Sequence, residues 1–589
     1  MPTLRLFFAI LILCGSGSAV KAAPTHLVEE RAVSITRQDS GRIIVDFGRV
    51  AFGNIKLLPP EGAKGKITVH FGEAFANGRV DRDPIGTVRY NKARVRLKGA
   101  KPILVAPAKN SRNTEVRSRK HPPAILTPAE WGVVMPFRWL EIEGWDGELL
   151  AEQIVRQSAF SSTWNDQASS FESSDEVLNQ VWELSRYSIK ATTFAGVYVD
   201  GDRERIPYEA DAYLNQLSHY ATDNDVQMAR DTFDHLMQYG TWPTEWAPHM
   251  VFMAYADWMH TGDLQWLAPR YDSLRSKLLL ERAGKNGLIT SNKRQIERTD
   301  IVDWPRVERD DYVFTEVNTV VNAFHLRVMY QMAELADALG RKADAENFGN
   351  TAKASQQVFQ ETLFNSESGL YRDGISTDHS ALHANLFPLA FGLVPLNRQR
   401  HIVDWLVERG MACSVYAAQY LLEGLFEYGA DDAAIELMVA PGDRSWRHMV
   451  ESGTTITWEA WDVKYKPNLD WNHAWGAAPA NLLPRFVLGA QPLKPGWEKV
   501  RIKPMPGKLA NAKGKVPTPR GPIVIDWVGG DNFNLSLTLP ENVTAKVELP
   551  AGPASEGVWI NGKQAKATVA GDYWLIDQEI TRSAQFEVK

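Results

Sequence analysis

The chain has 589 residues, of which 44% are hydrophobic and 23% are charged. This composition is typical of globular proteins and excludes a disordered chain, while the length exceeds what one hydrophobic core supports, so we expect two to four domains. The formal net charge of −6 argues against general nucleic-acid binding.

Residues 1–22 have the pattern of a cleaved secretory signal peptide. Arg5 precedes an apolar run from Leu6 to Leu13, and small residues follow. The run is too short for a permanent anchor, and no other stretch is apolar enough for a membrane span. We therefore expect a periplasmic or secreted protein. After cleavage only Cys413 would remain, so we expect a buried thiol and no intramolecular disulfide.

Residues 23–165 have the alternation of β-strands. Ile67, Val69 and Phe71 alternate with polar residues, and similar short segments are bounded by Gly and Pro. This pattern predicts an N-terminal β-sandwich. We expect a polar insert at about residues 101–123 to be a solvated loop, with contact to an acidic polysaccharide as the alternative.

Residues 166–490 change to a period of 3.6, which predicts helices. The expected helices cover residues 211–222, 225–239, 316–340, 343–361, 397–410, 416–429 and 474–486. Many antiparallel helices with short connectors favour a toroid of helical hairpins. The absence of a strict sequence repeat makes a regular solenoid less suitable.

Residues 491–589 return to strand periodicity. Phe533, Leu535 and Leu537 alternate with polar residues, and Asn561-Gly562 is a hairpin turn signal. We expect a second, smaller β-sandwich here. The predicted fold class is therefore a multidomain α and β protein in the order sandwich, helical toroid, sandwich.

A dense charge cluster, DGDRERIPYEAD from Asp200 to Asp211, follows an apolar run. Such a cluster is costly to order unless its members pair or do chemistry. We expect Pro207 to open a helix, which places Glu204 in the preceding loop and Asp211 in the first turn. A solvated helix entry with ion pairs is one alternative. A calcium loop is another, disfavoured because Arg205 stands where such a loop needs Gly.

A second unusual stretch, TTITWEAWD, places Glu459 between two tryptophans. Two carboxylate sites with aromatic neighbours suggest a glycoside hydrolase, in which one carboxylic acid protonates the leaving oxygen and the other acts as base or nucleophile. An ordinary position at the edge of a core is the alternative for Glu459. The adjacent arginines and the helix N-terminus would lower the pKa of an acid at Glu204, so that acid would need a close carboxylate neighbour.

These segments resemble the inverting α-L-rhamnosidases of glycoside hydrolase family 78. Asp200, Arg203, Glu204 and Asp211 match the family's acidic signature, and GTTITWEAWD with the later NHAWG matches its second motif. The resemblance extends over nearly the whole mature chain. It implies an (α/α)6 toroid flanked by two β-sandwiches, with no cofactor and no metal.

The resemblance also implies roles for individual residues. Glu204 would be the general acid and Glu459 the general base. The expected substrate-binding residues are Asp200, Arg203, Asp211, Asp303, Trp304, Trp458, Trp461, His473 and Trp475. The family's Cys-Pro is replaced by Gly201-Asp202, and its Gly-Trp by Pro207-Tyr208, which removes a Trp that would form a wall of the sugar subsite.

The sequence therefore predicts an inverting exo-α-L-rhamnosidase that removes terminal α-L-rhamnosyl residues from a plant or algal glycan or glycoside. Two alternatives are a polysaccharide lyase on a similar toroid, which would use a Tyr or His base, and a non-catalytic carbohydrate-binding protein.

Overall fold

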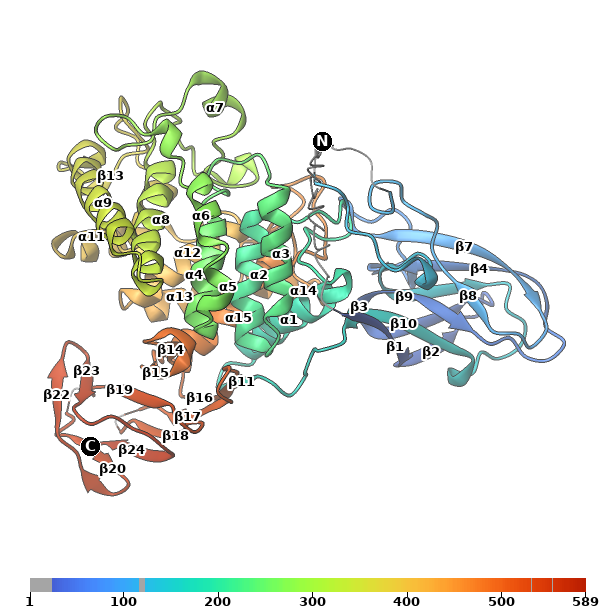
Figure 1. Cartoon of the computed structure of the whole chain (residues 1–589). Coiled ribbons are helices and arrows are strands. Elements are labelled where there is room, and N and C mark those ends of the chain that lie inside the picture. Colours follow the sequence, from blue (N-terminus) through green and yellow to red (C-terminus); the bar gives the residue numbers. More distant parts are fainter. Residues whose placement is uncertain (1–23, 116–121, 531, 553) are drawn as a thin grey trace, which may run out of the picture.

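The computed structural model describes residues 24–115, 122–530, 532–552 and 554–589, and the predicted signal peptide lies outside them. Figure 1 shows strands in blue on one side of a central helical domain and strands in red against another face of it. The predicted order of sandwich, helical domain and sandwich is confirmed at this level. Within the described ranges, no helix has the length and apolar character needed to cross a membrane.

The N-terminal domain is built on an antiparallel sheet with the order β1-β10-β3-β9-β4-β7, in which β2 and β8 also pair with β3. The long strand β3 bends where its pairing with β9 shifts register between Asp46 and Ala51, and Gly48 there has a φ of 76°. The strands are β1 (Thr25–Arg31), β2 (Ser34–Arg37), β3 (Ile43–Leu57), β4 (Lys64–Gly72), β7 (Tyr90–Lys98), β8 (Ile103–Val105), β9 (Met135–Glu143) and β10 (Ile154–Ser161).

The helical domain is a closed double ring. The inner helices contact one another in the order α2, α4, α8, α10, α12 and α15, and α15 returns to α2. The inner ring is α2 (Glu209–Thr222), α4 (His249–Thr261), α8 (Thr319–Ala338), α10 (Leu382–Ala390), α12 (Val415–Glu427) and α15 (Ala478–Leu482). The outer helices include α1 (Glu176–Thr192), α3 (Gln227–Gln238), α9 (Lys342–Leu363), α11 (Leu396–Arg409) and α13 (Asp431–Val439). This arrangement is the predicted (α/α)6 toroid.

Aromatic side chains fill the centre of the ring. His249 lies with its Nε2 2.7 Å from the hydroxyl of Tyr420, and Phe324 packs against both rings. Burial lowers the pKa of His249 to about 3, so its imidazole is neutral near neutral pH. Because the interior is packed, a substrate site can only be built from the loops at one end of the ring.

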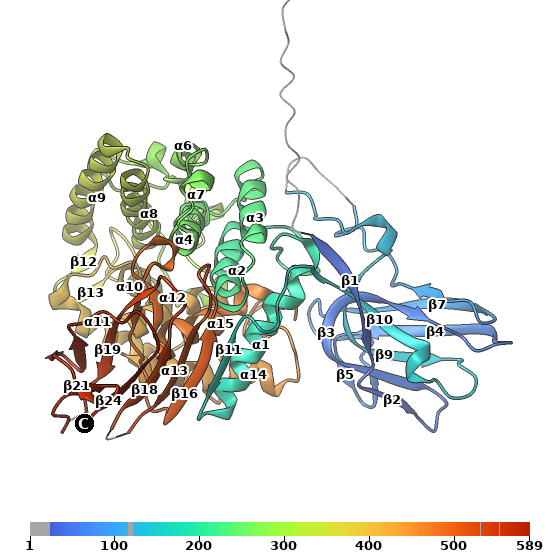
Figure 2. The same ribbon diagram turned by 60° about the horizontal axis from the view of Figure 1, so that its bottom comes forward.

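The C-terminal domain consists of two sheets, with the orders β11-β16-β17-β18-β24-β20-β21 and β14-β15-β19-β23-β22. Figure 2 shows both sheets beside the helical ring. The strands are β11 (Ser170–Ser173), β14 (Ala490–Pro492), β15 (Lys499–Ile502), β16 (Asn511–Val516), β17 (Ile523–Val528), β18 (Asn534–Thr538), β19 (Thr544–Pro550), β20 (Val558–Ile560), β21 (Lys563–Gln564), β22 (Ala567–Ala570), β23 (Tyr573–Ile576) and β24 (Ala584–Val588).

In this domain, one sequence prediction, a hairpin turn, is confirmed, and one strand comes from a part of the chain predicted to be helical. The predicted hairpin turn at Asn561-Gly562 is confirmed, because β20 pairs with β21 and both turn residues have positive φ. Strand β11, however, precedes the helical domain in the chain and pairs with β16. The C-terminal domain is therefore hydrogen-bonded to the segment just before the N-terminus of α1.

Candidate active site

The candidate residues come from segments that lead into the N-termini of inner helices. Glu204 lies in the loop before α2, Asp303 in the segment before α8, and Glu459 and His473 in the segment before α15. Glu204 lies in the loop before the helix and Asp211 in its first turn, as predicted, but the helix starts at Glu209, two residues after Pro207, with Tyr208 as its N-cap. The inner ring thus gathers acidic side chains at one end, where helix N-termini favour negative charge.

Arg203 joins the two carboxylate motifs. Its Nη1 donates to Oε2 of Glu459 at 2.6 Å and its Nη2 donates to Oε1 at 2.8 Å, so the pair is bidentate. The Nε of the same guanidinium lies 4.0 Å from Oε1 of Glu204. The two contacts and the width of one guanidinium place the nearest oxygens of Glu204 and Glu459 no more than about 9 Å apart.

Glu204 and Glu459 have different surroundings. Glu459 is buried and also lies 3.3 Å from the ammonium of Lys466. Glu204 retains 34% of its side-chain exposure and accepts a hydrogen bond from the hydroxyl of Tyr208 at 3.2 Å. The more accessible carboxyl and the enclosed, cation-bound carboxylate are therefore chemically distinct.

Asp200 is a second carboxyl group in the loop that carries Glu204. It is buried, and its Oδ1 accepts the backbone N–H of Ile206 at 2.9 Å. Burial, reinforced by the charge of Glu204, raises the pKa of Asp200 well above its usual range. Asp200 and Glu204 therefore interact electrostatically inside one short loop.

His473 lies between two carboxylates. Its Nε2 is 2.7 Å from Oδ1 of Asp211, and its Nδ1 is 3.4 Å from Oδ1 of Asp470. Burial alone would lower the pKa of His473, but the two carboxylates raise it well above its usual range. Burial likewise would raise the pKa of Asp470, and His473 and Arg203 lower it. The imidazolium therefore links the first turn of α2 to the segment before α15.

The three tryptophans near Glu459 are enclosed by protein. Trp458 stacks on Trp471 with ring centroids 5.1 Å apart. Trp461 is fully buried and donates its indole N–H to the carbonyl of Cys413 at 2.8 Å. Trp475 donates its indole N–H to the carbonyl of Glu459 at 3.1 Å. In this structure their indoles contact the neighbouring protein, and their contact with sugar stays a prediction.

Asp303 and Trp304 lie in the segment before α8. Asp303 is fully buried and accepts hydrogen bonds from the backbone of Ser414 at 2.9 Å and lies 2.7 Å from Nε2 of His383. Trp304 remains partly exposed, and the Lys466 ammonium lies 5.7 Å from the centroid of its ring. Asp303 therefore fixes the backbone that presents the Trp304 indole.

The N-terminal domain contacts the Glu204 loop through Asp202. The Nε of Arg89 lies 2.6 Å from Oδ2 of Asp202, and its Nη2 donates to the Asp202 carbonyl at 2.7 Å. Arg205 donates to the same carboxylate at 2.7 Å. Asn113, from the insert predicted to be solvated, is buried and donates to the Asp202 carbonyl. The solvated-loop prediction is wrong at that residue.

Asn472 links three segments. Its Oδ1 accepts the Asp202 N–H at 2.7 Å, and its Nδ2 donates to Oε1 of Glu73 at 3.1 Å. Burial raises the pKa of Glu73 to about 8. Gly201 has a φ of 110°, and a Cβ there would lie 2.8 Å from the Asn472 carbonyl oxygen. The replacement of Cys-Pro by Gly201-Asp202 is thus accommodated by specific contacts to the N-terminal domain and to Asn472.

Glu459, Asp470 and His473 each offer a metal-ligating atom within 4.8 Å of the others. Arg203 and Lys466 contact this group, with Arg203 3.8 Å from Asp470 and Lys466 3.3 Å from Glu459. These cations already compensate the negative charge that would attract a metal ion, so the donor set does not fit one.

Several residues of this site were not singled out from the sequence. Tyr208 was noted only as a replacement for Trp, and Lys466 carries no local signal. Glu73 and Arg89 lie in another domain, more than 100 residues from the loop that they support. The closely spaced acidic and aromatic residues of the segment 470–475 could have indicated Asp470 and Asn472.

The fold is a toroid of helical hairpins with two carboxylate segments at one end, which is the architecture of the six-hairpin glycosidase class. Comparison with known families agrees: the bacterial α-L-rhamnosidase 6 hairpin glycosidase domain matches residues 166–487. The concanavalin-like domain of the same proteins matches residues 36–160, and their C-terminal domain matches residues 489–563. The chain therefore belongs to the bacterial α-L-rhamnosidase family, as a distant member of glycoside hydrolase family 78.

Curated relatives carry the same description. The chain is 25% identical over 463 residues to an α-L-rhamnosidase of Alteromonas sp. (strain LOR), covering 70% of this chain and 48% of the relative. It is 22% identical over 562 residues to one of Streptomyces avermitilis, covering 90% of this chain and 50% of the relative. The chain thus spans about half the length of the curated relatives that it matches.

Solved structures support the fold. The α-L-rhamnosidase from Dictyoglumus thermophilum superposes with a TM-score of 0.78 at 17% identity, covering 97% of this chain and 64% of that one. The Streptomyces avermitilis α-L-rhamnosidase complexed with L-rhamnose also gives 0.78, at 19% identity, covering 96% of this chain and 54% of that one.

Proposed function

We propose that this protein is an exo-acting, inverting α-L-rhamnosidase. The observation that carries the proposal is the contact of one guanidinium, Arg203, with both carboxylate motifs. An upper limit of about 9 Å between the nearest oxygens of Glu204 and Glu459 is compatible with the separation of roughly 6.5–9.5 Å that leaves room for a water in inverting glycosidases.

Glu204 is the proposed general acid. It is accessible and has Tyr208 as its hydrogen-bond partner, so a leaving oxygen can approach its carboxyl group. The neighbouring Asp200 is a second, buried carboxyl group in the same loop, and its contact with a sugar hydroxyl is part of the proposal. The loop thus combines proton donation with substrate orientation.

Glu459 is the proposed general base. Arg203 and Lys466 hold its carboxylate in one orientation. Each carboxylate oxygen has about two lone-pair sites, so the bidentate contact leaves acceptor capacity for a water molecule. The Trp475 indole fixes the backbone of the same residue. A carboxylate held in one orientation is better suited to take a proton from a neighbouring water molecule than a mobile one.

The lyase alternative has less support from this site. A lyase would need a Tyr or His base. Burial and the charges of Asp200 and Glu204 raise the pKa of Tyr208, which disfavours the phenolate that would act as the base. His473 is held as an imidazolium between Asp211 and Asp470, and a protonated imidazole cannot accept a proton.

The relatives named above are described as α-L-rhamnosidases, so the proposed substrate is a glycan or glycoside with a terminal α-L-rhamnosyl residue. We expect this substrate to be of plant or algal origin. The charged and apolar pattern of residues 1–22 supports cleavage and export to the periplasm or the medium. Detection of the mature N-terminus in a periplasmic or culture fraction would test the export proposal.

The experiment compares release of p-nitrophenol from p-nitrophenyl α-L-rhamnoside by the parent, Glu204→Gln and Glu459→Gln. We expect turnover by the parent and losses of orders of magnitude in both variants, with unchanged circular dichroism. Sugar binding without turnover by the folded parent would instead favour the non-catalytic carbohydrate-binding alternative.

A further inference from the structure

A pocket of about 340 Å³ lies beside the candidate active site, within the size range of small-ligand pockets of roughly 300–1,000 Å³. Its aromatic wall includes Trp242, Trp304 and Phe314. Trp242 and Trp304 meet edge to face with centroids 6.1 Å apart, and Trp242 is 46% exposed. Flat, accessible indole faces are suited to the apolar face of a sugar ring.

Three arginines line the same pocket: Arg298, Arg306 and Arg309. Within the described part of the chain, none of them forms an ion pair with a carboxylate. The two acidic residues of the lining have other partners, because Asp300 contacts Arg282 at 3.3 Å and Glu297 contacts Lys293 at 3.8 Å. The pocket therefore carries uncompensated positive charge.

The guanidinium of Arg309 is held in place on one side and, within the described structure, has free donors on the other. Its Nε donates to the Asp303 carbonyl at 2.9 Å, which fixes the guanidinium. Its terminal nitrogens donate to no acceptor among the described residues. Burial lowers the pKa of Arg309, an effect that Asp303 and Glu245 partly offset and that the positive charge of Arg306 reinforces. An anion bound between Arg306 and Arg309 would relieve their repulsion.

The pocket adjoins the surroundings of both proposed catalytic residues. Trp304 lies 5.7 Å from the Lys466 ammonium, which lies 3.3 Å from Glu459. Trp242 belongs to the loop that also carries Trp246, and Trp246 packs against Tyr208, the hydrogen-bond partner of Glu204. A sugar joined to a rhamnosyl residue in the active site would therefore be within reach of the pocket.

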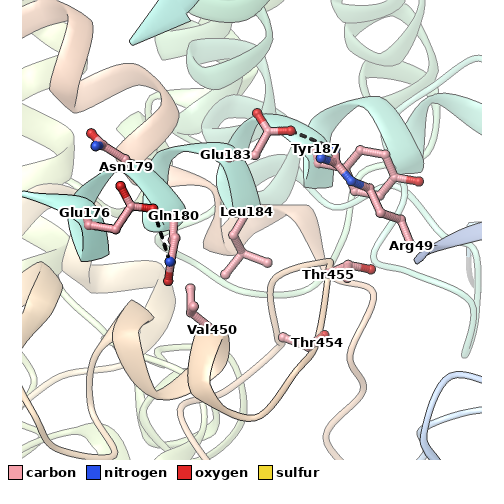
Figure 3. A pocket seen from close by; sticks show the side chains of 10 residues that line it. All are labelled: Arg49, Glu176, Asn179, Gln180, Glu183, Leu184, Tyr187, Val450, Thr454 and Thr455. Atoms are coloured by element: carbon pink, nitrogen blue, oxygen red, sulfur yellow. Dashed lines mark hydrogen bonds and ion pairs between the residues drawn. The ribbon is translucent and has the colours of Figure 1, made fainter. Parts of the chain in front are cut away.

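A second pocket offers a useful contrast. It has a volume of about 370 Å³ and lies between the N-terminal domain and α1 (Figure 3). There the Arg49 guanidinium donates to Glu183 at 2.7 Å, so its charge is already compensated. Size alone does not distinguish the two pockets, but only the one at Trp304 combines accessible indoles with unpaired arginines in the described structure.

We propose that the pocket lined by Trp242, Trp304, Arg306 and Arg309 binds a uronic acid unit of the substrate, attached to the rhamnosyl residue that is cleaved. The planar carboxylate of a uronic acid matches the fork of an arginine, and its ring matches the indole faces. This inference rests on the proposed α-L-rhamnosidase function and specifies its substrate class.

The test uses two disaccharides with the same linkage, α-L-rhamnose joined to D-glucuronate and α-L-rhamnose joined to D-glucose. They differ by a carboxylate in place of a hydroxymethyl group. We expect the parent to cleave the glucuronate compound with a KM about tenfold lower, because a charge-assisted hydrogen bond is gained. The preference should fall as the salt concentration rises, because the pocket is partly exposed.

The variants are Arg306→Gln and, as a matched control, Arg294→Gln. Both arginines are exposed, and Arg294 lies on α7 (Lys293–Arg298) but does not line the pocket. Arg306→Gln should raise KM for the glucuronate compound about tenfold and leave KM for the glucose compound unchanged. Arg294→Gln should change neither. Equal KM values for both compounds in the parent, or equal effects of the two variants, would overturn the inference while the proposed function stands.

Calorimetric titration separates the remaining case, in which neither disaccharide is cleaved. The proposed function would then fail. Tighter binding of the glucuronate compound by the parent, lost in Arg306→Gln, would still support the pocket assignment. Equal binding of the two compounds, or no binding of either, would overturn it.

Discussion

Substitution of Arg89 by Gln tests whether the N-terminal domain supports the acid loop. The Arg89 guanidinium lies 2.6 Å from the Asp202 carboxylate and also donates to the Asp202 carbonyl at 2.7 Å. A glutamine is shorter and uncharged, so it cannot reproduce both contacts. Asp202 would keep its contact with Arg205 at 2.7 Å and its backbone hydrogen bond to Asn472.

The expected magnitude follows from this partial loss. Removing one partner of a buried ion pair costs about 3–5 kcal/mol. Arg205 remains as a partner and Arg89 is partly exposed, at 17% of its side chain, so we expect about 2 kcal/mol. If this free energy is lost from the ordered form of the loop that holds Glu204, kcat/KM for an aryl rhamnoside falls about 30-fold.

Arg138→Gln is the matched control. Arg138 lies on β9 and forms a bidentate contact with Asp46 at 2.8 and 2.9 Å, and among the described residues it forms no hydrogen bond with the acid loop. Both variants should lower the midpoint of urea unfolding, but only Arg89→Gln should lower kcat, and Arg89→Lys should restore part of it. The reasoning is refuted if Arg89→Gln keeps kcat/KM within about twofold of the parent, or if Arg138→Gln loses as much.

Three further predictions follow from single contacts. Tyr208→Phe removes the hydrogen bond to Glu204 and should lower kcat about threefold to tenfold in initial-rate measurements with little change in KM; an unchanged kcat would contradict a role for that bond. Burial raises the pKa of Glu73 to about 8, so its stabilising contribution is complete below pH 4.5 and is lost as the pH rises through 8. Glu73→Gln should therefore gain stability relative to the parent between pH 5 and pH 9 in urea unfolding, and a constant difference would refute the raised pKa. Trp461→Phe should lower stability in urea unfolding, because Trp461 is fully buried and bonded to the Cys413 carbonyl. If Trp461 also contacts sugar, as the sequence predicts, KM should rise in the folded variant, and an unchanged KM would contradict that contact.

The sequence predicted the architecture well because hydrophobic periodicity reports local structure. The strand at Ile67–Phe71 and the helix at 211–222 match β4 and α2 closely. Helices α4 and α10 were not predicted. Both lie in the inner ring and are apolar on most sides, so they lack the one-sided pattern that marks a surface helix.

The candidate site could be predicted only in part. Glu204 and Glu459 were selected because charged residues next to aromatic and apolar runs require a reason. Their connection through Arg203 spans 256 residues of sequence and depends on closure of the helical ring. Arg89 and Glu73 look like ordinary residues of a β-rich domain, and only the packing of that domain on the Glu204 loop gives them a role.

Proton NMR of the sugar released from p-nitrophenyl α-L-rhamnoside tests the central claim most directly. If Glu459 activates water while Glu204 protonates the leaving oxygen, the first product is β-L-rhamnose, and the α anomer appears later by mutarotation. Initial formation of α-L-rhamnose would indicate a covalent intermediate, with the carboxyl groups roughly 5–5.5 Å apart, and would contradict the roles assigned to the two residues.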